Sequence, residues 1–338
     1  METFERTSEG NDTVSLHQLT EFLRNTYPRC DDDEKFGARA HHIFKKYGGT
    51  DALSRDGFLC LWNTLLEKCI KPKSALVVVD YQNDFIDGSL SLKKCPLGDD
   101  PELLLPRLNE FIVKSDEVVY SLDWHPEDHI SFIECRNRRK THESNRIDPG
   151  AVKVAEELFF EIQGRPYIQK MWPRHCVQHS EGARLHKDLV VKEGAIFVYK
   201  GTDPEVDSYS AFWDNRRSSK TNLKESLLER GITNLIVVGL AFDACVLFTA
   251  LDAIREGFTT CVVRELTSAI SEATIEEAVQ KLTDAHCPRI SFDAAYRMLS
   301  GGPLPWIFVW QQACQVSLVR DTCCPSSPAS DREIDESD

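Results

Sequence analysis

The sequence lacks any hydrophobic run long enough to cross a membrane. Its best candidate, residues 304–309, is far shorter than the roughly 20 apolar residues that a spanning helix needs. An apolar signal segment is also missing from the first residues, which include acidic side chains. We therefore expect a cytoplasmic protein without a membrane partner, and entry into the nucleus stays open.

An excess of basic residues is missing as well. The chain has 40 Lys and Arg against 54 Asp and Glu, a formal net charge of -14 at pH 7. Nucleic-acid binding needs a basic face that neutralises backbone phosphates. The short basic cluster at residues 136–140 is better explained as a solvated loop. The charge balance predicts no nucleic-acid partner.

The cysteines form neither a disulfide framework nor a metal motif. Twelve of them are scattered through 338 residues, whereas disulfide scaffolds are short and dense in cysteine. The adjacent pair Cys323 and Cys324 has no second pair at metal-binding spacing. A reducing compartment is expected, and the 41% hydrophobic content supports a sizeable core in more than one structural unit.

Three segments differ in character along the chain. Residues 1–70 have the apolar spacing of several short helices. Residues 71–299 alternate short apolar runs with amphipathic ones, which is typical of a catalytic-sized α/β domain. Residues 300–338 form a C-terminal extension, in which residues 303–312 are apolar enough to pack on the domain. The acidic, polar tail from residue 325 is expected to be disordered.

The helical segment contains a sequence that resembles an EF-hand loop, with Asp56 and Gly57 at the sharp turn. If Gly57 is the sixth loop position, Ala52 occupies the first ligand position and Asn63 replaces the bidentate glutamate. Two of the strongest ligands are then missing. We expect a degenerate EF-hand-like module in which calcium binding is disfavoured.

The middle segment predicts a doubly wound, mostly parallel sheet flanked by helices, because strand and helix patterns alternate along it. The expected strands lie at residues 75–79, 118–122, 195–199, 235–238, 260–263 and 289–290. The expected helices lie at residues 101–113, 152–161, 222–229, 244–256 and 275–285. Ligands of such folds bind beyond the carboxyl ends of the strands.

Asp80, Lys200 and Cys245 stand at or just past the ends of three expected strands. A thiol nucleophile needs a base for its proton and a cation beside the thiolate, and this acid and amine can supply them. Cys245 is expected near the first turn of a helix, whose positive end favours a thiolate. Each residue alone has a plainer explanation: a helix cap, a solvated lysine or a packing cysteine. Their shared edge favours catalysis.

A second group of residues indicates a metal site. Asp123 and His125 are two apart in extended backbone, so they face the same side and can bind one ion. His175 is the third candidate ligand, and His129 is a reserve. Three protein ligands with open positions for water are typical of a catalytic metal centre. Because the chain has ten histidines, a lone one indicates little.

Five motifs occur in order between residues 74 and 290. They are Val-Val-Asp-Tyr-Gln-Asn-Asp-Phe at 78–85, Asp-Trp-His-Pro at 123–126 with His-Ile-Ser-Phe at 129–132, Trp-Pro-Arg-His-Cys-Val at 172–177, Lys-Gly at 200–201, and Gly-Leu-Ala at 239–241 before Cys-Val at 245–246. Together they closely resemble the nicotinamidases of the isochorismatase-like hydrolase superfamily. The EF-hand-like leader resembles the animal nicotinamidases that carry one.

The resemblance implies a metal-containing cysteine amidohydrolase that converts nicotinamide to nicotinate and ammonia through a thioester, a reaction of NAD salvage. Asp80, Lys200 and Cys245 match the family's catalytic triad, with Asp80 as the base and Cys245 as the nucleophile. The backbone N–H groups of Ala241 and Cys245 match its oxyanion hole. The family's cis peptide would fall at the Leu240–Ala241 bond.

The resemblance also implies one divalent metal ion, usually zinc and in some relatives iron or manganese. Asp123, His125 and His175 match the family's metal ligands. His129 is a ligand only in some relatives, and the spacing varies there. Whether the ion binds the pyridine nitrogen or activates the hydrolytic water stays open, although the resemblance favours the first.

The pocket residues follow from the same resemblance. Phe85 and Trp172 match the aromatic walls that sandwich the pyridine ring, and Tyr209 is expected to help close the pocket. The implied partner is the small-molecule substrate nicotinamide, and a homo-oligomer stays open. Two alternatives remain: a superfamily hydrolase that acts on another small amide, and a calcium-responsive binding protein with a vestigial hydrolase domain.

Overall fold

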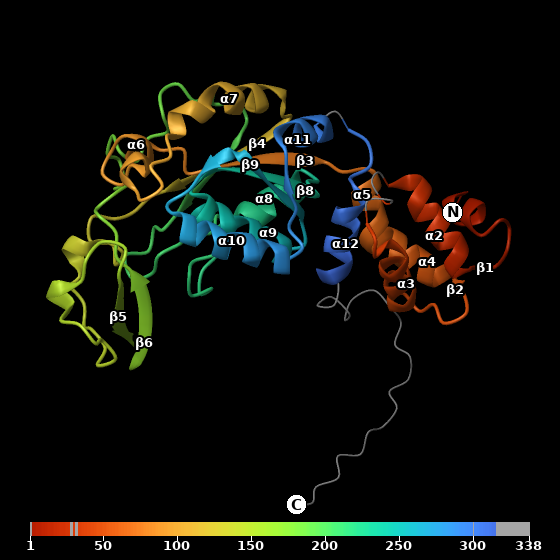
Figure 1. Cartoon of the computed structure of the whole chain (residues 1–338), viewed down its shortest axis with the longest axis horizontal. Coiled ribbons are helices and arrows are strands. Elements are labelled where there is room, and N and C mark those ends of the chain that lie inside the picture. Colours follow the sequence, from red (N-terminus) through yellow and green to blue (C-terminus); the bar gives the residue numbers. More distant parts are fainter. Residues whose placement is uncertain (1, 28–29, 31–32, 300, 316–338) are drawn as a thin grey trace, which may run out of the picture.

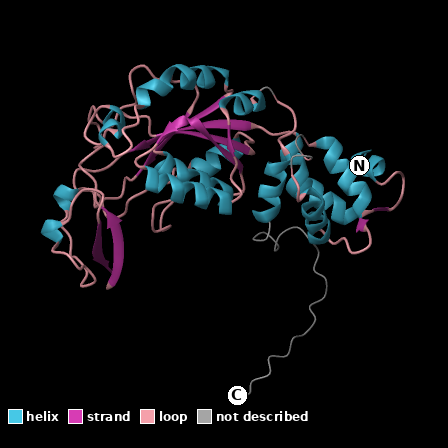
Figure 2. Cartoon of the chain, viewed as in Figure 1, coloured by secondary structure: helices cyan, strands magenta, loops and turns pink. Residues whose placement is uncertain are grey.

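The centre of the computed structural model is a six-stranded parallel sheet (Figure 1 and Figure 2). The structure describes residues 2–27, 30, 33–299 and 301–315. The strand order is β10-β9-β8-β3-β4-β7, and each neighbouring pair runs parallel. The strands are β3 (Ser74–Val79), β4 (Glu117–Asp123), β7 (Ile196–Lys200), β8 (Asn234–Leu240), β9 (Thr259–Ser268) and β10 (Arg289–Ile290).

Helices cover both faces of this sheet (Figure 1), because side chains alternate along each strand between opposite layers. Leu76 and Val78 of β3 join the core on one face, and Val77 and Val79 join the core on the other. The helices on the two faces are α7 (Leu105–Lys114) and α11 (Phe292–Met298), and opposite them α8 (Leu223–Glu229), α9 (Leu247–Arg255) and α10 (Glu272–Asp284). The predicted doubly wound sheet is confirmed.

β3 and β8 lie side by side where the chain changes its direction across the sheet. From β3 the chain moves outward through β4 to β7, and then returns to β8 on the other side of β3. In open α/β sheets, ligands bind beyond the strand ends at such a switch point. Asp80 follows β3 and Cys245 follows β8, so both residues lie beside this position.

The long excursion between β4 and β7 contains a hairpin at one end of the molecule (Figure 1), formed by β5 (Glu157–Ile162) and β6 (Arg165–Lys170). The two strands pair antiparallel. The prediction of a helix at residues 152–161 is therefore wrong. A short helix, α6 (Asn83–Ile86), lies just after Asp80.

Strand periodicity explains why the helix prediction failed. Leu158 and Phe160, two residues apart, are both buried in a small satellite core. Gln163 and Gly164 have positive φ angles of 52° and 73°, which is the conformation of a two-residue hairpin turn. The apolar run is short, and short runs fit both the helical and the strand period.

The N-terminal module is a group of short helices at the other end of the sheet (Figure 1). These are α1 (Glu2–Thr7), α2 (Leu16–Thr26), α3 (Phe36–Lys46), α4 (Arg55–Leu61) and α5 (Glu67–Ile70), with a π turn (Trp62–Leu66) between the last two. Two short strands, β1 (Thr13–Val14) and β2 (Leu53–Ser54), pair antiparallel between the loops. The apolar core of the module is continuous with the core on one face of the sheet.

Gly57 lies in the first turn of α4, so the loop register that we assumed for an EF-hand is wrong. Ser54 caps this helix, and its Oγ accepts a hydrogen bond from the Gly57 N–H at 3.1 Å. A Cβ at position 57 would lie 2.6 Å from the Tyr47 carbonyl oxygen. The glycine therefore allows close packing of a helix start and does not form a sharp loop turn. That calcium binding to this module is disfavoured stays a prediction.

α12 (Trp306–Gln315) contacts both the N-terminal module and the sheet. The Trp306 ring packs edge-on against Phe36 of α3, with ring centroids 4.8 Å apart. On its other side, the Gln311 amide accepts from the Thr260 N–H at 2.8 Å and donates to the Thr260 carbonyl at 2.7 Å. The predicted packing of the apolar C-terminal segment is confirmed, and α12 joins the two parts of the chain.

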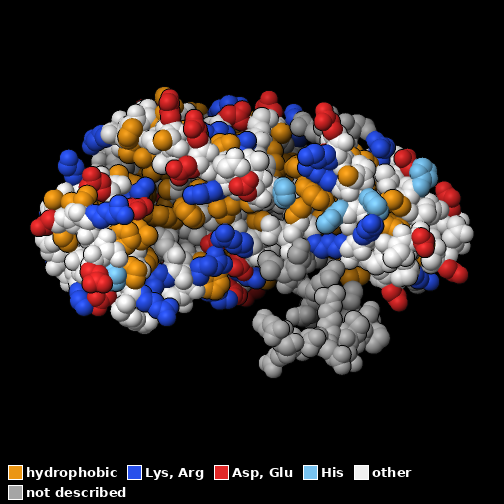
Figure 3. All heavy atoms as spheres, turned by 60° about the horizontal axis from the view of Figure 1, so that its bottom comes forward, with side chains coloured by type: hydrophobic (Ala, Val, Ile, Leu, Met, Phe, Trp, Pro, Cys, Tyr) orange, Lys and Arg blue, Asp and Glu red, His pale blue; other side chains and the backbone are white. Residues whose placement is uncertain are grey.

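Figure 3 shows acidic and basic side chains interspersed over one face of the molecule, with apolar side chains between them. Within the part of the chain that the structure describes, no helix combines the length and apolarity needed to cross a membrane. The predicted disordered tail and the Cys323–Cys324 pair lie outside the described residues. The proposed domain boundaries at residues 70/71 and 299/300 stay predictions.

Candidate active site

The structure brings Asp80, Lys200 and Cys245 together at the carboxyl edge of the sheet. Lys200 is the last residue of β7, and its Nζ lies 2.8 Å from Asp80 Oδ2 and 3.3 Å from Cys245 Sγ. The sulfur and an Asp80 carboxylate oxygen lie within 4.8 Å of each other. Three residues that are distant in sequence thus form one contact group, because parallel strands end at a common edge.

Lys200 is buried among acceptors. Besides Asp80, its Nζ contacts Asp123 Oδ1 at 2.5 Å and donates to the Ser208 carbonyl at 3.0 Å. Burial alone would lower the pKa of Lys200, but Asp123 and Asp80 outweigh that effect and raise the pKa well above its ordinary value. The side chain is therefore a fixed ammonium ion between two carboxylates and a thiol.

Burial raises the pKa of the Asp80 carboxyl above its ordinary value, and Lys200 offsets only part of this effect. The Ser121 hydroxyl donates to Asp80 Oδ1 at 2.7 Å and fixes that oxygen. The backbone of Asp80 has a positive φ of 48°, which turns the chain sharply as it leaves β3. A carboxylate with a raised pKa is a stronger base, as proton abstraction from a thiol requires.

Burial also raises the pKa of the Cys245 thiol well above its ordinary value, despite the nearby Lys200 ammonium. Burial therefore opposes the thiolate that we expected the start of the helix to favour. Cys245 lies in a π turn (Phe242–Val246), and α9 begins only at Leu247. Desolvation outweighs the effect of the Lys200 charge on the thiol pKa, so the thiol needs a proton acceptor within reach.

The turn before Cys245 depends on a glycine at its start. Gly239 has a φ of 107°, and a Cβ at this position would lie 2.2 Å from the carbonyl oxygen of Val79. Only glycine lets β8 approach β3 so closely where Asp80 leaves the sheet. The peptide bond between Leu240 and Ala241 is cis, as the resemblance implied.

Asp123, His125 and His175 also lie together, and each offers one ligand atom within 4.8 Å of the others. The His125 Nε2 is 3.4 Å from Asp123 Oδ2, and the His175 Nε2 is 3.7 Å from the same oxygen. Burial would raise the pKa of Asp123, but Lys200 and His125 hold it well below its usual range. Asp123 is therefore an ionised carboxylate between two imidazoles.

The second nitrogen of each histidine is held by a backbone carbonyl. His125 Nδ1 lies 2.9 Å from the Gly201 carbonyl oxygen, and His175 Nδ1 lies 2.7 Å from that of Pro173. These bonds place the proton on Nδ1 and leave the Nε2 lone pairs facing Asp123, which is how metal-binding histidines are usually oriented. The buried Nε2 of His125 has no hydrogen-bond partner among the described residues. This donor set fits a divalent metal ion.

His129 lies beside this group without sharing its orientation. Its ring stacks on the His125 ring at a centroid distance of 4.1 Å. Its Nδ1 lies 2.7 Å from Ser131 Oγ, and its Nε2 lies 3.3 Å from the Val206 carbonyl oxygen. Both ring nitrogens thus contact protein groups. A ligand atom of His129 also lies within 4.8 Å of ligand atoms of His125 and Asp207, so the reserve role of His129 stays a prediction.

The predicted pocket residues line one cavity together with the thiol and two of the three metal-ligand candidates. Its walls are formed by Phe85, Leu90, Leu92, Cys95, Asp123, Trp172, His175, Asp207, Tyr209, Ala241, Ala244, Cys245 and Ile270. The Trp172 Nε1 donates to the Tyr209 hydroxyl at 3.3 Å, and the Phe85 ring lies 5.5 Å from the His175 ring. The cavity is mostly apolar and its lining includes a thiol, an imidazole and carboxylates, which suits a small aromatic amide.

Gln82 is a site residue that sequence reasoning missed. Its side-chain amide accepts from the Asp123 N–H at 2.8 Å and donates to the Asp123 carbonyl at 2.7 Å. The same Nε2 donates to the Ala183 carbonyl at 2.9 Å. Gln82 is fully buried, so it fixes the backbone of a metal-ligand candidate to the segment that follows Asp80. Its position inside the first motif was the available signal.

Two further carboxylates position the loops around the cavity. Asp84 Oδ2 accepts from the Cys176 N–H at 2.7 Å, which holds the loop that carries His175. Asp243, in the turn before Cys245, accepts from the Ile270 N–H at 2.9 Å and from the Ser271 N–H at 3.2 Å. Sequence gave no sign of these roles, because their partners are backbone groups of distant segments.

The fold and site together define an α/β protein whose parallel sheet carries a buried acid, lysine and thiol at its carboxyl edge. The chain belongs to the isochorismatase family, because the model of the isochorismatase domain matches residues 74–291. The nicotinamidase of Escherichia coli (strain K12) is 41% identical to it over 196 residues, which are 57% of this chain and 82% of that protein.

Solved structures agree with this assignment. The nicotinamidase and pyrazinamidase of Acinetobacter baumanii superposes with a TM-score of 0.57 at 33% identity, over 66% of this chain and 98% of that one. The PnC1 protein of L. infantum in complex with nicotinate superposes with a TM-score of 0.51 at 29% identity, over 67% of this chain and 97% of that one. The matched share corresponds to the α/β domain.

Proposed function

We propose that this protein hydrolyses nicotinamide to nicotinate and ammonia through a thioester on Cys245. The observation that carries the proposal is the contact of the Lys200 ammonium with both Asp80 and Cys245, at 2.8 and 3.3 Å, where Cys245 lines a cavity with aromatic walls. The nicotinamidases among its relatives support the choice of substrate. The nicotinate complex of the L. infantum protein supports the choice of product.

In the first half of the reaction, Asp80 takes the proton of the Cys245 thiol and the sulfur attacks the amide carbon. Lys200 stabilises the developing thiolate, because its ammonium lies beside the sulfur. The backbone N–H groups of Ala241 and Cys245 are positioned to hold the oxyanion, an effect of about 10²–10³ in rate per donor. The carbon–nitrogen bond then breaks, and Asp80 returns its proton to the leaving ammonia.

In the second half, Asp80 takes a proton from a water molecule, and the oxygen attacks the thioester carbon. The same backbone N–H groups hold the oxyanion. The carbon–sulfur bond breaks, nicotinate forms, and the Cys245 sulfur regains its proton from Asp80. The raised pKa of Asp80 serves both halves, since one carboxyl has to accept a proton and then donate it.

The cavity orients the substrate for this attack. Phe85 and Trp172 flank the pyridine ring, and the hydrogen bond from Trp172 to Tyr209 fixes the wall beside them. Leu92 and Ile270 complete an apolar lining that excludes water from the ring. The carboxamide then lies beside the thiol.

Asp123, His125 and His175 would hold a divalent metal ion, which we propose to be zinc, with iron or manganese as alternatives. When bound, the ion supplies Lewis acidity, for orienting the pyridine nitrogen or for polarising water. Zinc in catalytic sites is commonly bound by three protein ligands such as one carboxylate and two imidazoles, and its remaining coordination position is open to water or substrate. Gln82, Gly201 and the Pro173 carbonyl hold these ligands in place.

A matched pair of cysteine variants tests this function. Cys245→Ala should reduce ammonia release from nicotinamide by roughly 10⁴- to 10⁶-fold while the fold and the metal content stay intact. Cys69→Ala removes a thiol that is also buried and has a pKa raised to about 12 by burial, but in the helical module, and should leave turnover per folded molecule unchanged. Substantial turnover by Cys245→Ala would sink the proposal.

The same assay separates the alternatives. Turnover of another small amide, but not of nicotinamide, would place the protein elsewhere in the superfamily. A fluorescence change on addition of calcium, with no amide hydrolysis, would favour a calcium-responsive binding protein. The cytoplasmic location is proposed on sequence grounds alone, and cell fractionation tests it. The oligomeric state stays open, and light scattering measures it.

A further inference from the structure

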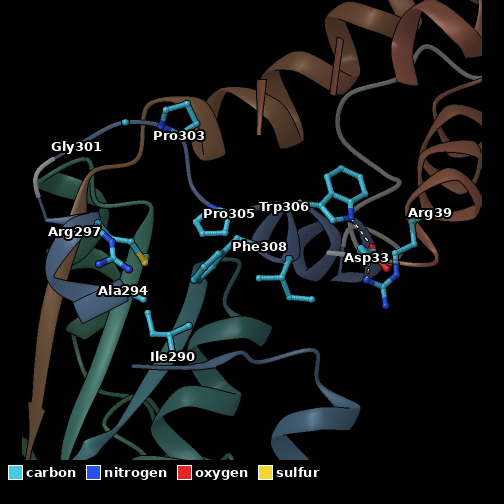
Figure 4. Close-up of a pocket in the computed structure, with 13 residues that line it drawn as sticks. Asp33, Arg39, Ile290, Ala294, Arg297, Gly301, Pro303, Pro305, Trp306 and Phe308 are labelled. Carbon is cyan, nitrogen blue, oxygen red and sulfur yellow. Dashed lines mark hydrogen bonds and ion pairs between the residues drawn. The ribbon is translucent and has the colours of Figure 1, made fainter. Parts of the chain in front are cut away.

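A second cavity, of about 520 Å³, lies away from the catalytic edge at the junction of the N-terminal module and the C-terminal segment (Figure 4). Its volume is within the range of small-molecule sites, which often occur where structural units meet. Ile290, Ala294 and Arg297 form one side in Figure 4, and Pro305 and Phe308 face them. None of the residues that line it belongs to the proposed catalytic group.

The walls of this cavity are largely apolar. Besides the residues already named, Met298, Pro303, Trp306 and Ile307 contribute to the lining. Trp306 and Phe308 are almost fully buried, so they form a rigid base that binding does not need to reorganise. Such a surface suits the apolar or aromatic body of a small ligand.

The charged side chains in the lining determine which sign of charge a ligand should carry. They are Asp33, Arg39 and Arg297. Asp33 is already paired, because its Oδ2 lies 2.8 Å from Arg39 Nη1 and accepts from Trp306 Nε1 at 2.7 Å. Arg39 also stacks over the Trp310 ring, at 4.9 Å from its centroid. These two residues neutralise each other and are held in place.

With Asp33 and Arg39 paired, Arg297 is the one charged residue of the lining that is not neutralised by another lining residue. Among the residues that the structure describes, it has no hydrogen-bond or ion-pair partner. Its guanidinium presents a planar fork that matches a carboxylate, sulfonate or phosphate oxygen pair. Arg297 is exposed, so an acidic group whose apolar body lies in the cavity can reach the guanidinium.

From this arrangement we infer that the cavity is a binding site for a small amphipathic monoanion. The acidic head group pairs with Arg297, and the apolar body lies along Ile290, Ala294 and Pro305. The bound molecule touches α11, α12 and the start of α3, so it stabilises the junction between the module and the α/β domain through binding linkage. The site does not depend on the proposed reaction.

The test uses the full-length chain and two fluorescent probes that share a ring system. 8-Anilinonaphthalene-1-sulfonate carries one negative charge, and N-phenyl-1-naphthylamine carries none. We expect one saturable site for the sulfonate, competition by decanoate, and a rise in the melting temperature on binding. Arg297→Gln should weaken sulfonate binding about tenfold and leave binding of the neutral probe unchanged.

Two further variants make the result decisive. Ala294→Phe fills the cavity and should abolish binding of both probes. Arg165→Gln removes one exposed positive charge from the β5–β6 hairpin and should change neither. All three variants should keep their nicotinamide turnover, so a failure of this inference is distinct from a failure of the proposed function. Equal sulfonate binding in Arg297→Gln, or persistent binding in Ala294→Phe, would overturn the inference.

Discussion

The carboxyl edge of the sheet and the N-terminal helical module are both closely packed, but they bury different groups. At the edge, Asp80, Asp123 and Lys200 are at most 4% exposed and contact one another. In the module, the fully buried positions carry no charge and are mainly apolar, for example Leu19 and Leu65, with Ser8 as a neutral polar exception. Burying an ion costs several kcal/mol unless it is paired, so a protein retains such a group where the chemistry needs it.

This difference separates the effects of substitutions in the two regions. At the edge, each polar group holds another, and a single change alters the charge or geometry of the whole group. In the module, apolar packing tolerates changes that conserve volume. Matched pairs of variants, one from the edge and one from elsewhere, therefore test whether the two regions respond differently to substitution.

The largest effect is expected for Lys200→Met. It leaves Asp80 and Asp123 facing each other in a buried site without their shared cation. Nicotinamide turnover should be lost, and the free energy of unfolding should fall by about 3–5 kcal/mol. Lys140→Met removes an ion pair with Glu161 whose lysine side chain is 73% exposed, and should cost less than about 1 kcal/mol. Urea denaturation measures both, and similar losses would contradict the comparison.

Gly201→Ala should release the metal ion. A Cβ at this position would lie 2.3 Å from His125 Cε1, so the imidazole has to move away from Asp123. Metal affinity should fall by roughly 10- to 100-fold. Gly48→Ala in the module shares the strain of a positive φ, here 99°, but its Cβ would meet nothing within 4 Å.

Both glycine variants should lose about 1–2 kcal/mol of stability from backbone strain. Only Gly201→Ala should lose metal, which elemental analysis after dialysis measures. Full metal content in that variant would show that the Gly201 carbonyl and the close approach to His125 do not position the ligand.

Gln82→Met should have a smaller effect on turnover, of roughly 10- to 100-fold, because it frees the Asp123 backbone and leaves the ligand itself in place. The matched control is Gln312→Met in α12. Gln312 is buried, and its Nε2 has no hydrogen-bond partner within the described ranges. Removing an unsatisfied amide costs little or stabilises.

We therefore expect the two glutamine variants to change the free energy of unfolding differently. Chemical denaturation should show a loss of stability for Gln82→Met and a change near zero, or a gain, for Gln312→Met. A Gln82→Met enzyme with normal kcat and metal content would show that the triple contact of this amide is structural only.

The residues at the carboxyl edge of the sheet were predictable because the hydrophobic pattern of the sequence shows where each buried strand ends. Continuous apolar runs mark buried parallel strands, and such strands end together. Asp80, Lys200 and Cys245 could therefore be grouped before any coordinates were known. The five ordered motifs added the metal-ligand candidates and the aromatic walls. The structure places Cys245, Asp123, His175 and the aromatic walls around one cavity. Asp80, Lys200 and His125 are in direct contact with this group.

The remaining features depend on contacts that have no local signature. Gln82 acts on the backbone of a residue 41 positions away, and an amide that binds backbone groups looks like any polar residue in a sequence. Gly57 was misassigned because the sequence alone does not distinguish a glycine that close packing requires from a glycine that a sharp turn requires. The raised pKa of Cys245 reflects burial, which only the folded chain defines.

Acid quenching of the enzyme during turnover of nicotinamide, followed by peptide mass spectrometry, tests the central claim most directly. The account predicts a nicotinoyl group on Cys245 that is absent from Cys245→Ala. Cys95, the other thiol in the cavity wall, should stay unmodified. A nicotinoyl group on any other residue, or turnover with no acyl-enzyme and full activity in Cys245→Ala, would contradict it.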